Sequence, residues 1–319
     1  MNTKRLHITW KTSTHQTYFA SLDGEYCPVS NVDSLKPIAV KENTFPGGEQ
    51  HLRLDIAEDS ITDDAHLVLA ARYNTAADLI KIVLAADAAR RLGFSKTTLI
   101  LPYFPAARQD RVCNVGEPLT VKIFADMINS CGFDAVHILS PHSEVTPALL
   151  NNVVVHDECE LVETMLKEWI TASMSTTINI VCPDAGAGKR VGKVASYLAK
   201  RFPQNTVNLI RCEKVRDVRD GSLKEFFVQA DDLGGHPTLI IDDIVAYGGT
   251  FLGLADKLRE RNCGELGIFV SHADCEAGIE NLKQKFDVVA ATDSKRDYAG
   301  YSLDNDPIVK IIPFKVQTA

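Results

Sequence analysis

LIIDDIVAYGGTF, residues 239–251, combines a short apolar run, a pair of carboxylates, a turn and two glycines. An apolar run that ends abruptly in polar residues is typical of a strand buried on both faces of a parallel sheet. Gly248 and Gly249 let backbone N–H groups approach a ligand closely, and a helix predicted from Thr250 adds the positive end of its dipole. The stretch therefore predicts a strand–turn–helix unit of an α/β fold, with an anion-binding turn at the carboxyl end of the strand.

The same alternation of short apolar runs and amphipathic stretches covers most of the chain. HLVLAARY (66–73) is predicted to be a strand, and the stretch after it a helix that ends at Gly93. The second half repeats the pattern, with helices predicted at 188–201, 250–262 and 276–285. Near-continuous apolar strands separated by helices indicate parallel sheets covered on both faces. We therefore predict an α/β protein with two similar domains, each a mainly parallel sheet flanked by helices.

The length of 319 residues exceeds that of one typical domain of about 100–200 residues, so two domains are expected. The segment NNVVVHDECE, near residues 150–160, divides the chain into similar halves. We expect an N-terminal domain over 1–153, a C-terminal domain over 154–304 and a tail over 305–319. The tail contains the apolar run VKIIPF, a last strand that can return to either sheet, the N-terminal one included.

Composition limits the environment and the partners. Apolar residues make up 45% and charged residues 24%, as in ordinary globular proteins. The eight cysteines stand singly, without metal-ligand spacing, which argues against zinc and favours a reducing compartment. No signal-peptide core precedes the first strand, and no apolar run approaches the roughly 18 residues of a membrane helix. With a net charge of −8, we expect a cytoplasmic protein with no nucleic-acid or membrane partner, which binds small anions through local basic clusters.

Two familiar nucleotide motifs are absent. The chain has no Gly-x-Gly-x-x-Gly, and PDAGAGKR fails as a P-loop because Pro183 replaces the first glycine and Arg190 the Ser or Thr that binds magnesium. The Gly-Gly-Thr turn instead suits a phosphate. Asp242 and Asp243 suit the hydroxyls of a sugar, or an ion bound by them. Together these groups predict a site for ribose that carries a 5-phosphate.

Several motifs carry a resemblance to known families. DDIVAYGGT resembles the phosphoribosyl-binding signature of the type I phosphoribosyltransferase fold. LPYFPAARQDRVCNVGEPLTVKIFADMI resembles the loop of ribose-phosphate diphosphokinases, which reads Pro-Tyr-x-x-x-Ala-Arg-Gln-Asp-Arg and then Pro-[Ile/Leu]-Thr-x-Lys. FPGGEQHLRL, PHSE, PDAGAGKR and EKVR resemble, in order, the adenine loop, the metal-binding His loop, the Pro-Asp-x-Gly segment and the catalytic Lys-x-Arg of that family. The matches run from residue 45 to about residue 282, and both domains are expected to be phosphoribosyltransferase-like.

The resemblance implies that the anomeric hydroxyl of ribose 5-phosphate attacks the β-phosphorus of ATP and that AMP leaves, with Mg²⁺ as cofactor. It implies a ribose 5-phosphate site formed by Asp242, Asp243, Gly248, Gly249 and Thr250. It implies an ATP site formed by Phe45, Glu49, Arg108, Gln109, Arg111 and His142. Lys214 and Arg216 would be the catalytic pair, and His142 and Asp184 the metal ligands. Because the adenine site of this family is shared between subunits, a homo-oligomer built from dimers, such as a hexamer, is expected.

The sequence also departs from the family at four positions, Gly47, Ser140, Ala246 and Tyr247, where the pattern has an Asp or Asn, an acid, an Asp and a Thr. Three interpretations remain open: a divergent synthase, a catalytically weak or inactive regulatory homologue, and a phosphoribosyltransferase that consumes the diphosphate. The last leaves the Arg-Gln-Asp-Arg half without a role. Because both the catalytic pair and the metal histidine are present, we predict an active, magnesium-dependent diphosphotransferase.

Overall fold

The computed structural model describes residues 16–57, 61–173, 175–216, 223–296, 298 and 306–316. The chain divides into two compact units, one of Met1–His156 with Phe314–Ala319 and one of Asp157–Pro313. The last described residues belong to both units. β15 (Val309–Ile312) extends the second unit's sheet, and Val316 forms an isolated bridge with Val29 in the first.

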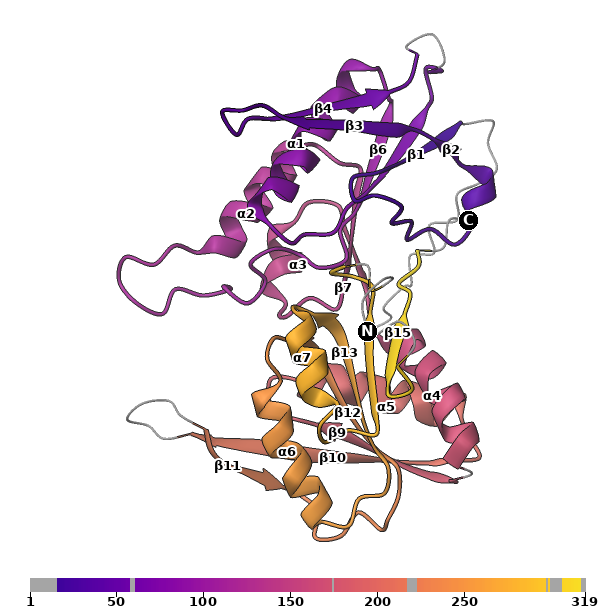
Figure 1. The fold of residues 1–319 in the computed structure, drawn as a ribbon, viewed down its shortest axis with the longest axis vertical. Helices are drawn as coiled ribbons and strands as arrows, with labels where there is room; N and C mark the ends of the chain where they lie inside the picture. Colours follow the sequence, from indigo (N-terminus) through magenta and orange to yellow (C-terminus); the bar gives the residue numbers. More distant parts are fainter. Residues whose placement is uncertain are drawn as a thin grey trace. The chain divides into compact units, whose positions relative to one another are not determined.

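A six-stranded parallel sheet forms the centre of the N-terminal unit, with the strand order β2-β1-β5-β6-β7-β8 (Figure 1). Its strands are β1 (Thr17–Ser21), β2 (Lys36–Pro37), β5 (His66–Ala70), β6 (Lys96–Ile100), β7 (Ala135–Leu139) and β8 (Val153–His156). A separate antiparallel hairpin contains β3 (Ala39–Thr44) and β4 (Gln50–Asp55). The helices are α1 (Ala76–Arg91), α2 (Thr120–Ser130), α3 (Val145–Leu149) and the 3-10 turn η1 (Val32–Ser34). Because β6 and β7 are parallel neighbours, the loops after them lie at the same edge of the sheet.

The C-terminal unit is built around a seven-stranded sheet with the order β11-β10-β9-β12-β13-β14-β15. Its other strands are β9 (Thr177–Cys182), β10 (Thr206–Arg216), β11 (Leu223–Val228), β12 (Thr238–Val245), β13 (Leu266–Ala273) and β14 (Val288–Thr292). All neighbours are parallel except β10 and β11. The helices are α4 (Cys159–Ser173), α5 (Gly188–Arg201), α6 (Gly249–Glu260) and α7 (Glu276–Leu282).

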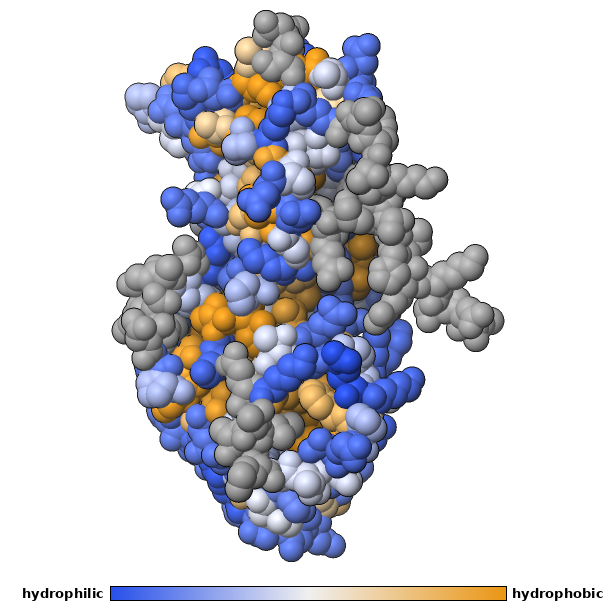
Figure 2. Space-filling model, turned by 90° about the vertical axis from the view of Figure 1, so that its right-hand side faces the viewer, coloured by the Kyte–Doolittle hydropathy of each residue, from blue (hydrophilic) through white to orange (hydrophobic). Residues whose placement is uncertain are grey.

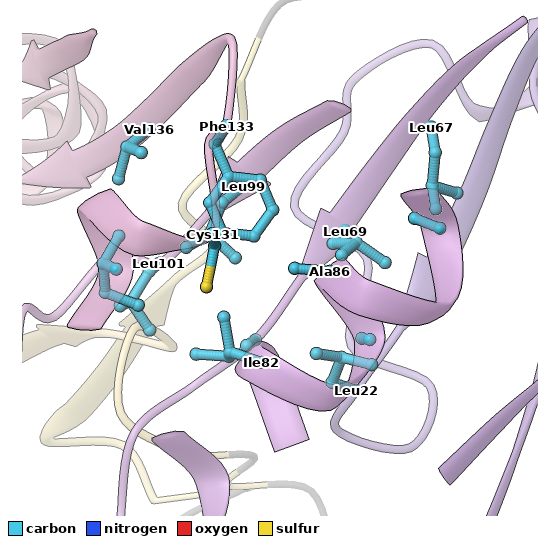
Figure 3. Close-up of a cluster of buried hydrophobic side chains, with 14 of the residues drawn as sticks. Leu22, Leu67, Leu69, Ile82, Ala86, Leu99, Leu101, Cys131, Phe133 and Val136 are labelled. Atoms are coloured by element: carbon cyan, nitrogen blue, oxygen red, sulfur yellow. The ribbon is translucent and has the colours of Figure 1, made fainter. Parts of the chain in front are cut away.

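The central strands are buried on both faces, as their apolar runs predict. Every residue of β5, β7 and β13 is buried. Figure 3 shows how one face of the N-terminal sheet is covered: Leu67 and Leu69 of β5 lie in one cluster with Ile82 and Ala86 of α1. Since successive side chains of a strand point to opposite faces, only helices on both sides can bury a strand completely.

The predicted fold class is confirmed: the chain has two domains with mainly parallel sheets flanked by helices. On the face drawn in Figure 2, hydrophilic residues predominate and hydrophobic ones occur in smaller groups between them. Within the described ranges, no helix is long and apolar enough to span a bilayer.

Candidate active site

The turn after β12 has the geometry of an anion-binding helix start. Gly248 adopts a left-handed φ of +79° and caps α6, which begins at Gly249. The N–H groups of Gly248, Gly249 and Thr250 make no hydrogen bond to any residue that the structure describes. Unpaired N–H groups at the positive end of a twelve-residue helix favour a bound anion.

The two carboxylates that end β12 are buried rather than exposed. The Asp243 side chain is 7% exposed and that of Asp242 is 14% exposed. The Asp243 N–H donates to Asp242 Oδ1 at 2.9 Å. Two buried carboxylates side by side are unfavourable without a compensating cation.

Arg190 of α5 is that cation. Its Nη1 atom donates to Asp242 Oδ1 at 3.2 Å and to Asp243 Oδ1 at 3.0 Å. On the other side, its Nε atom lies 3.9 Å from Glu158 Oε1. The Arg190 side chain is only 16% exposed, so these charges interact with little screening by water.

Burial and neighbouring charges shift the pKa values of Asp242 and Arg190. Burial and the adjacent Asp243 carboxylate raise the pKa of Asp242 above its usual range, whereas Arg190 lowers it. Burial also lowers the pKa of Arg190, but the surrounding carboxylates outweigh this and raise it overall. The sequence does not predict this role for Arg190, because its partners lie more than 50 positions away and give no local signal.

Asp184 lies in the loop between β9 and α5. Its Oδ1 atom accepts the Ala187 N–H at 3.1 Å, and its carbonyl accepts a hydrogen bond from Cys182 Sγ at 2.9 Å. A Cβ on Gly186 would lie 3.2 Å from Asp184 Oδ1, so the glycine keeps this side of the carboxylate uncrowded. The carboxylate thus fixes the turn into α5 at the same end of the sheet as the β12 turn.

Lys214 and Arg216 lie on the part of β10 that continues beyond β9. β10 pairs with β9 as far as Arg211 and then with β11 in an antiparallel ribbon, labelled in Figure 1. Lys214 is opposite Phe226, and the register shifts between Val215 and Arg216.

In the N-terminal unit, the long loop between β6 and α2 carries the Arg-Gln-Asp-Arg motif. Arg108, Gln109 and Arg111 are exposed, while Ala107 is buried. The loop is fixed further along by Glu117: its Oε2 atom accepts the N–H groups of residues 113 and 114, and its Oε1 accepts the Asn114 side chain. A fixed loop with exposed guanidinium groups suits a phosphate-bearing ligand.

His142 lies in the adjacent loop, which follows β7. The end of β7 is bonded to the start of the β6 loop, because the Leu139 N–H donates to the Pro102 carbonyl at 2.8 Å. Ser140 at the start of this loop is buried and has a left-handed φ of +38°. The structure thus places His142 in a loop that leaves the same sheet edge as the loop that carries Arg108.

Phe45 and Glu49 flank the turn of the β3–β4 hairpin. The Phe45 N–H donates to the Glu49 carbonyl at 2.9 Å. Phe45 is 46% exposed, and its ring lies near His51 of the same hairpin, at a ring-centroid distance of 5.9 Å. A Cβ on Gly47, between them, would have no atom of the described chain within 4 Å, so a larger side chain would fit there.

The donor set for a metal ion is sparse. Across the residues that the structure describes, no group of three or more His, Cys, Asp or Glu side chains forms a cage. Mg²⁺ commonly uses one or two protein carboxylates together with waters and substrate phosphates. A single carboxylate such as Asp184 fits that mode of binding.

Comparison with known proteins identifies the family. Residues 28–132 match the N-terminal domain of ribose phosphate pyrophosphokinase, and residues 159–306 match the phosphoribosyl transferase domain. The ribose-phosphate pyrophosphokinase of Pyrococcus abyssi is 28% identical over 264 residues, which cover 81% of this chain and 84% of the relative. The chain belongs to the ribose-phosphate pyrophosphokinase family.

Other members of the family give similar figures. The ribose-phosphate pyrophosphokinase of Saccharolobus solfataricus is 29% identical over 227 residues, or 70% of this chain and 72% of the relative. The crystal structure of phosphoribosylpyrophosphate synthetase from Mycobacterium smegmatis superposes with a TM-score of 0.74 at 19% identity, covering 93% of this chain and 94% of that one. The likeness to the Mycobacterium smegmatis structure supports the fold of both units and their order along the chain.

Two of the chain's departures from the pyrophosphokinase family pattern lie in the β12 turn. Ala246 offers no polar side chain, and the Tyr247 side chain is 73% exposed. Neither can replace a carboxylate or a small hydroxyl within the turn. The groups that this turn offers to an anion are therefore its backbone N–H groups and the Thr250 hydroxyl.

Proposed function

We propose that this chain is a ribose-phosphate diphosphokinase that converts ATP and ribose 5-phosphate to 5-phosphoribosyl 1-diphosphate and AMP. The observation that carries the proposal is the β12 turn, where an acidic pair held by Arg190 precedes a helix start with unpaired N–H groups. That arrangement offers acceptors for ribose hydroxyls and donors for a 5-phosphate. Membership of the pyrophosphokinase family supports the same assignment.

In the proposed reaction, the anomeric oxygen attacks the β-phosphorus of ATP. A new O–P bond forms at C1 of the ribose, the bond between the β-phosphorus and the bridging oxygen to the α-phosphorus breaks, and AMP leaves with that oxygen. Catalysis of such a transfer depends mainly on positioning and on neutralising charge. Lys214 and Arg216 are proposed to neutralise the transferring phosphates, Lys214 as a point charge and Arg216 as a bidentate donor.

Ribose 5-phosphate is proposed to bind with its hydroxyls donating to Asp242 and Asp243. Arg190 contacts the Oδ1 atom of each carboxylate. The 5-phosphate is proposed to accept hydrogen bonds from the Gly248–Thr250 segment. Because Arg190 holds the acidic pair in place, little reorganisation would accompany sugar binding.

ATP is proposed to bind to the N-terminal unit. Arg108, Gln109 and Arg111 would contact its phosphates and ribose, with His142 nearby at the same sheet edge. Phe45 and Glu49 would receive the adenine of ATP bound to a neighbouring subunit, which requires a homo-oligomer built from dimers. The exposed Phe45 ring at a hairpin tip supports this role, since an aromatic ring there offers a stacking surface.

Magnesium is the proposed cofactor. Asp184 and His142 would hold it together with the phosphates of ATP, and the bound ion would neutralise phosphate charge. The oxygen donor of Asp184, already fixed by the Ala187 N–H, suits a hard cation. We also propose a cytoplasmic location, where both substrates occur.

Incubation with ATP, ribose 5-phosphate, Mg²⁺ and phosphate tests the proposal, with AMP and 5-phosphoribosyl 1-diphosphate as the expected products. A panel of nucleoside triphosphates should be included because Gly47 removes a polar side chain from the adenine loop. Binding of ATP without any AMP release would favour a regulatory homologue. Consumption of 5-phosphoribosyl 1-diphosphate with a base would favour a phosphoribosyltransferase.

A further inference from the structure

The carbonyl side of the β12 turn is bonded to the segment that joins β13 to α7. Three consecutive carbonyls accept hydrogen bonds: those of Val245 and Ala246 from this segment, and that of Tyr247 from α7 itself. Their donors are the Asp274 N–H at 2.8 Å, Cys275 Sγ at 3.1 Å and Asn281 Nδ2 at 2.9 Å. With its carbonyls held on one side, the turn presents its N–H groups on the other.

Steric contact holds the same surfaces together. A Cβ on Gly278 of α7 would lie 2.0 Å from the Ala246 carbonyl oxygen, far inside any real contact distance. A Cβ on Gly248 would lie 3.2 Å from Leu282 Cδ2 and 3.4 Å from the Gly278 carbonyl oxygen. The turn and α7 therefore approach at backbone distance, and a side chain at position 278 would displace the turn.

We infer that Asn281 and Cys275 are positioning residues for the 5-phosphate of the sugar substrate. This inference rests on the proposed function. Because Ala246 and Tyr247 provide no side-chain contact to a phosphate, affinity depends on how well the Gly248–Thr250 N–H groups are oriented. Asn281 orients them by holding the Tyr247 carbonyl, which belongs to the same planar peptide group as the Gly248 N–H. Neither Asn281 nor Cys275 touches the substrate itself.

Two variants of Asn281 test the inference against matched changes at Gln284. Gln284 is exposed, lies three residues further along, and bonds to the Asn281 side chain rather than to the turn. Asn281→Ala removes the donor, and we expect a KM for ribose 5-phosphate about 3- to 10-fold higher, as for loss of one exposed hydrogen bond. The KM for ATP and kcat should stay within about 2-fold, and Gln284→Ala should behave as the wild type. An unchanged KM for ribose 5-phosphate in Asn281→Ala, or an equal rise for both substrates, overturns the inference.

Asn281→Asp distinguishes the effect of losing the hydrogen-bond donor from the effect of adding a charge. It keeps the size of the side chain but places an acceptor against the Tyr247 carbonyl, while Gln284→Glu adds the same charge nearby. We expect Asn281→Asp to weaken the binding of ribose 5-phosphate at least several-fold more than Gln284→Glu does. Equal effects of the two substitutions would mean that only long-range charge matters, and the inference would be wrong.

Substitutions of Cys275 provide an independent test, because serine can restore the hydrogen-bond donor that alanine removes. Cys275→Ala should raise the KM for ribose 5-phosphate about 2- to 5-fold, whereas Cys275→Ser, which keeps a donor, should stay closer to the wild type. Calorimetric titration of each variant with ribose 5-phosphate alone gives the same comparison without turnover. If the wild type binds ribose 5-phosphate but releases no AMP, the proposed reaction fails, and the titrations still decide the role of Asn281. Identical affinities in wild type, Asn281→Ala and Cys275→Ala would overturn the inference while the reaction stands.

Discussion

Replacing Arg190 with methionine tests the central electrostatic feature of the site. The substitution keeps an unbranched side chain in α5 but removes the guanidinium that contacts Asp242 and Asp243 at 3.2 and 3.0 Å. Both carboxylates are at most 14% exposed, and Glu158 beyond them is 3% exposed. Removing one partner from a buried ion pair costs about 3–5 kcal/mol, because the remaining charge is left uncompensated. We expect a loss of that size in the free energy of unfolding at pH 8.

The loss should depend on pH. Burial and Asp243 already raise the pKa of Asp242, and Arg190 opposes that rise. Without Arg190 the pKa of Asp242 in the folded protein rises further above that in the unfolded chain. A carboxyl group with a raised folded-state pKa binds more protons when folded, so stability falls as pH increases from about 4 towards the folded-state pKa. The variant should therefore lose more stability at pH 8 than at pH 5.

Lys193→Met is the matched control. Lys193 lies one turn further along α5 and pairs with Asp157 at 2.6 Å, but the two side chains are 63% and 41% exposed. An exposed pair of this kind contributes about 0–1 kcal/mol. Urea unfolding of wild type and both variants at pH 5 and pH 8 gives the comparison. Equal losses for Arg190→Met and Lys193→Met, or a loss for Arg190→Met that is the same at both pH values, would show that Arg190 does not stabilise the buried acidic pair.

Three further predictions concern the substrates. Lys214→Ala should lower kcat at least about 100-fold while ATP affinity, measured by calorimetry, changes little, because the charge acts mainly in the transition state; a large loss of ATP affinity would contradict this. Asp242→Asn should weaken the binding of ribose 5-phosphate about 10-fold or more. It should also raise the urea midpoint of unfolding at pH 8, since it removes a buried carboxyl whose pKa is raised. A lower midpoint at pH 8 would mean that burial of this carboxyl does not destabilise the fold. Phe45→Ala should raise the KM for ATP about 5- to 10-fold without changing the urea midpoint, because the ring is 46% exposed; unchanged ATP kinetics would exclude an adenine role.

The sequence predicts the central sheets well because their signals are local. The β12 stretch predicts a strand, a turn and a helix, and the structure has β12 (Thr238–Val245) followed by α6 (Gly249–Glu260). A helix predicted over 188–201 coincides with α5. In each case the apolar period and the glycines lie within one window of the chain.

The features that the sequence does not predict arise from contacts between distant segments. β11 and the extension of β10 form an antiparallel ribbon whose pairing depends on the partner strand more than on its own period. Arg190 and Asp242 are 52 positions apart in the sequence. Asn281 and Tyr247 are 34 positions apart. No spacing rule within a strand or helix predicts such pairs. The likeness of the glycine turn to known phosphate sites is visible in the sequence, but the segment that holds the turn is not.

The fate of labelled phosphorus in ATP is the most direct test of the proposed diphosphoryl transfer. ATP labelled at either the α- or the γ-phosphorus is incubated with the protein, ribose 5-phosphate and Mg²⁺, and the products are separated. If the diphosphoryl group is transferred, the α-label is recovered in AMP and the γ-label in 5-phosphoribosyl 1-diphosphate, in equal amounts. Recovery of the γ-label as inorganic phosphate with the α-label in ADP, or no transfer of label to the sugar, would contradict the proposed transfer.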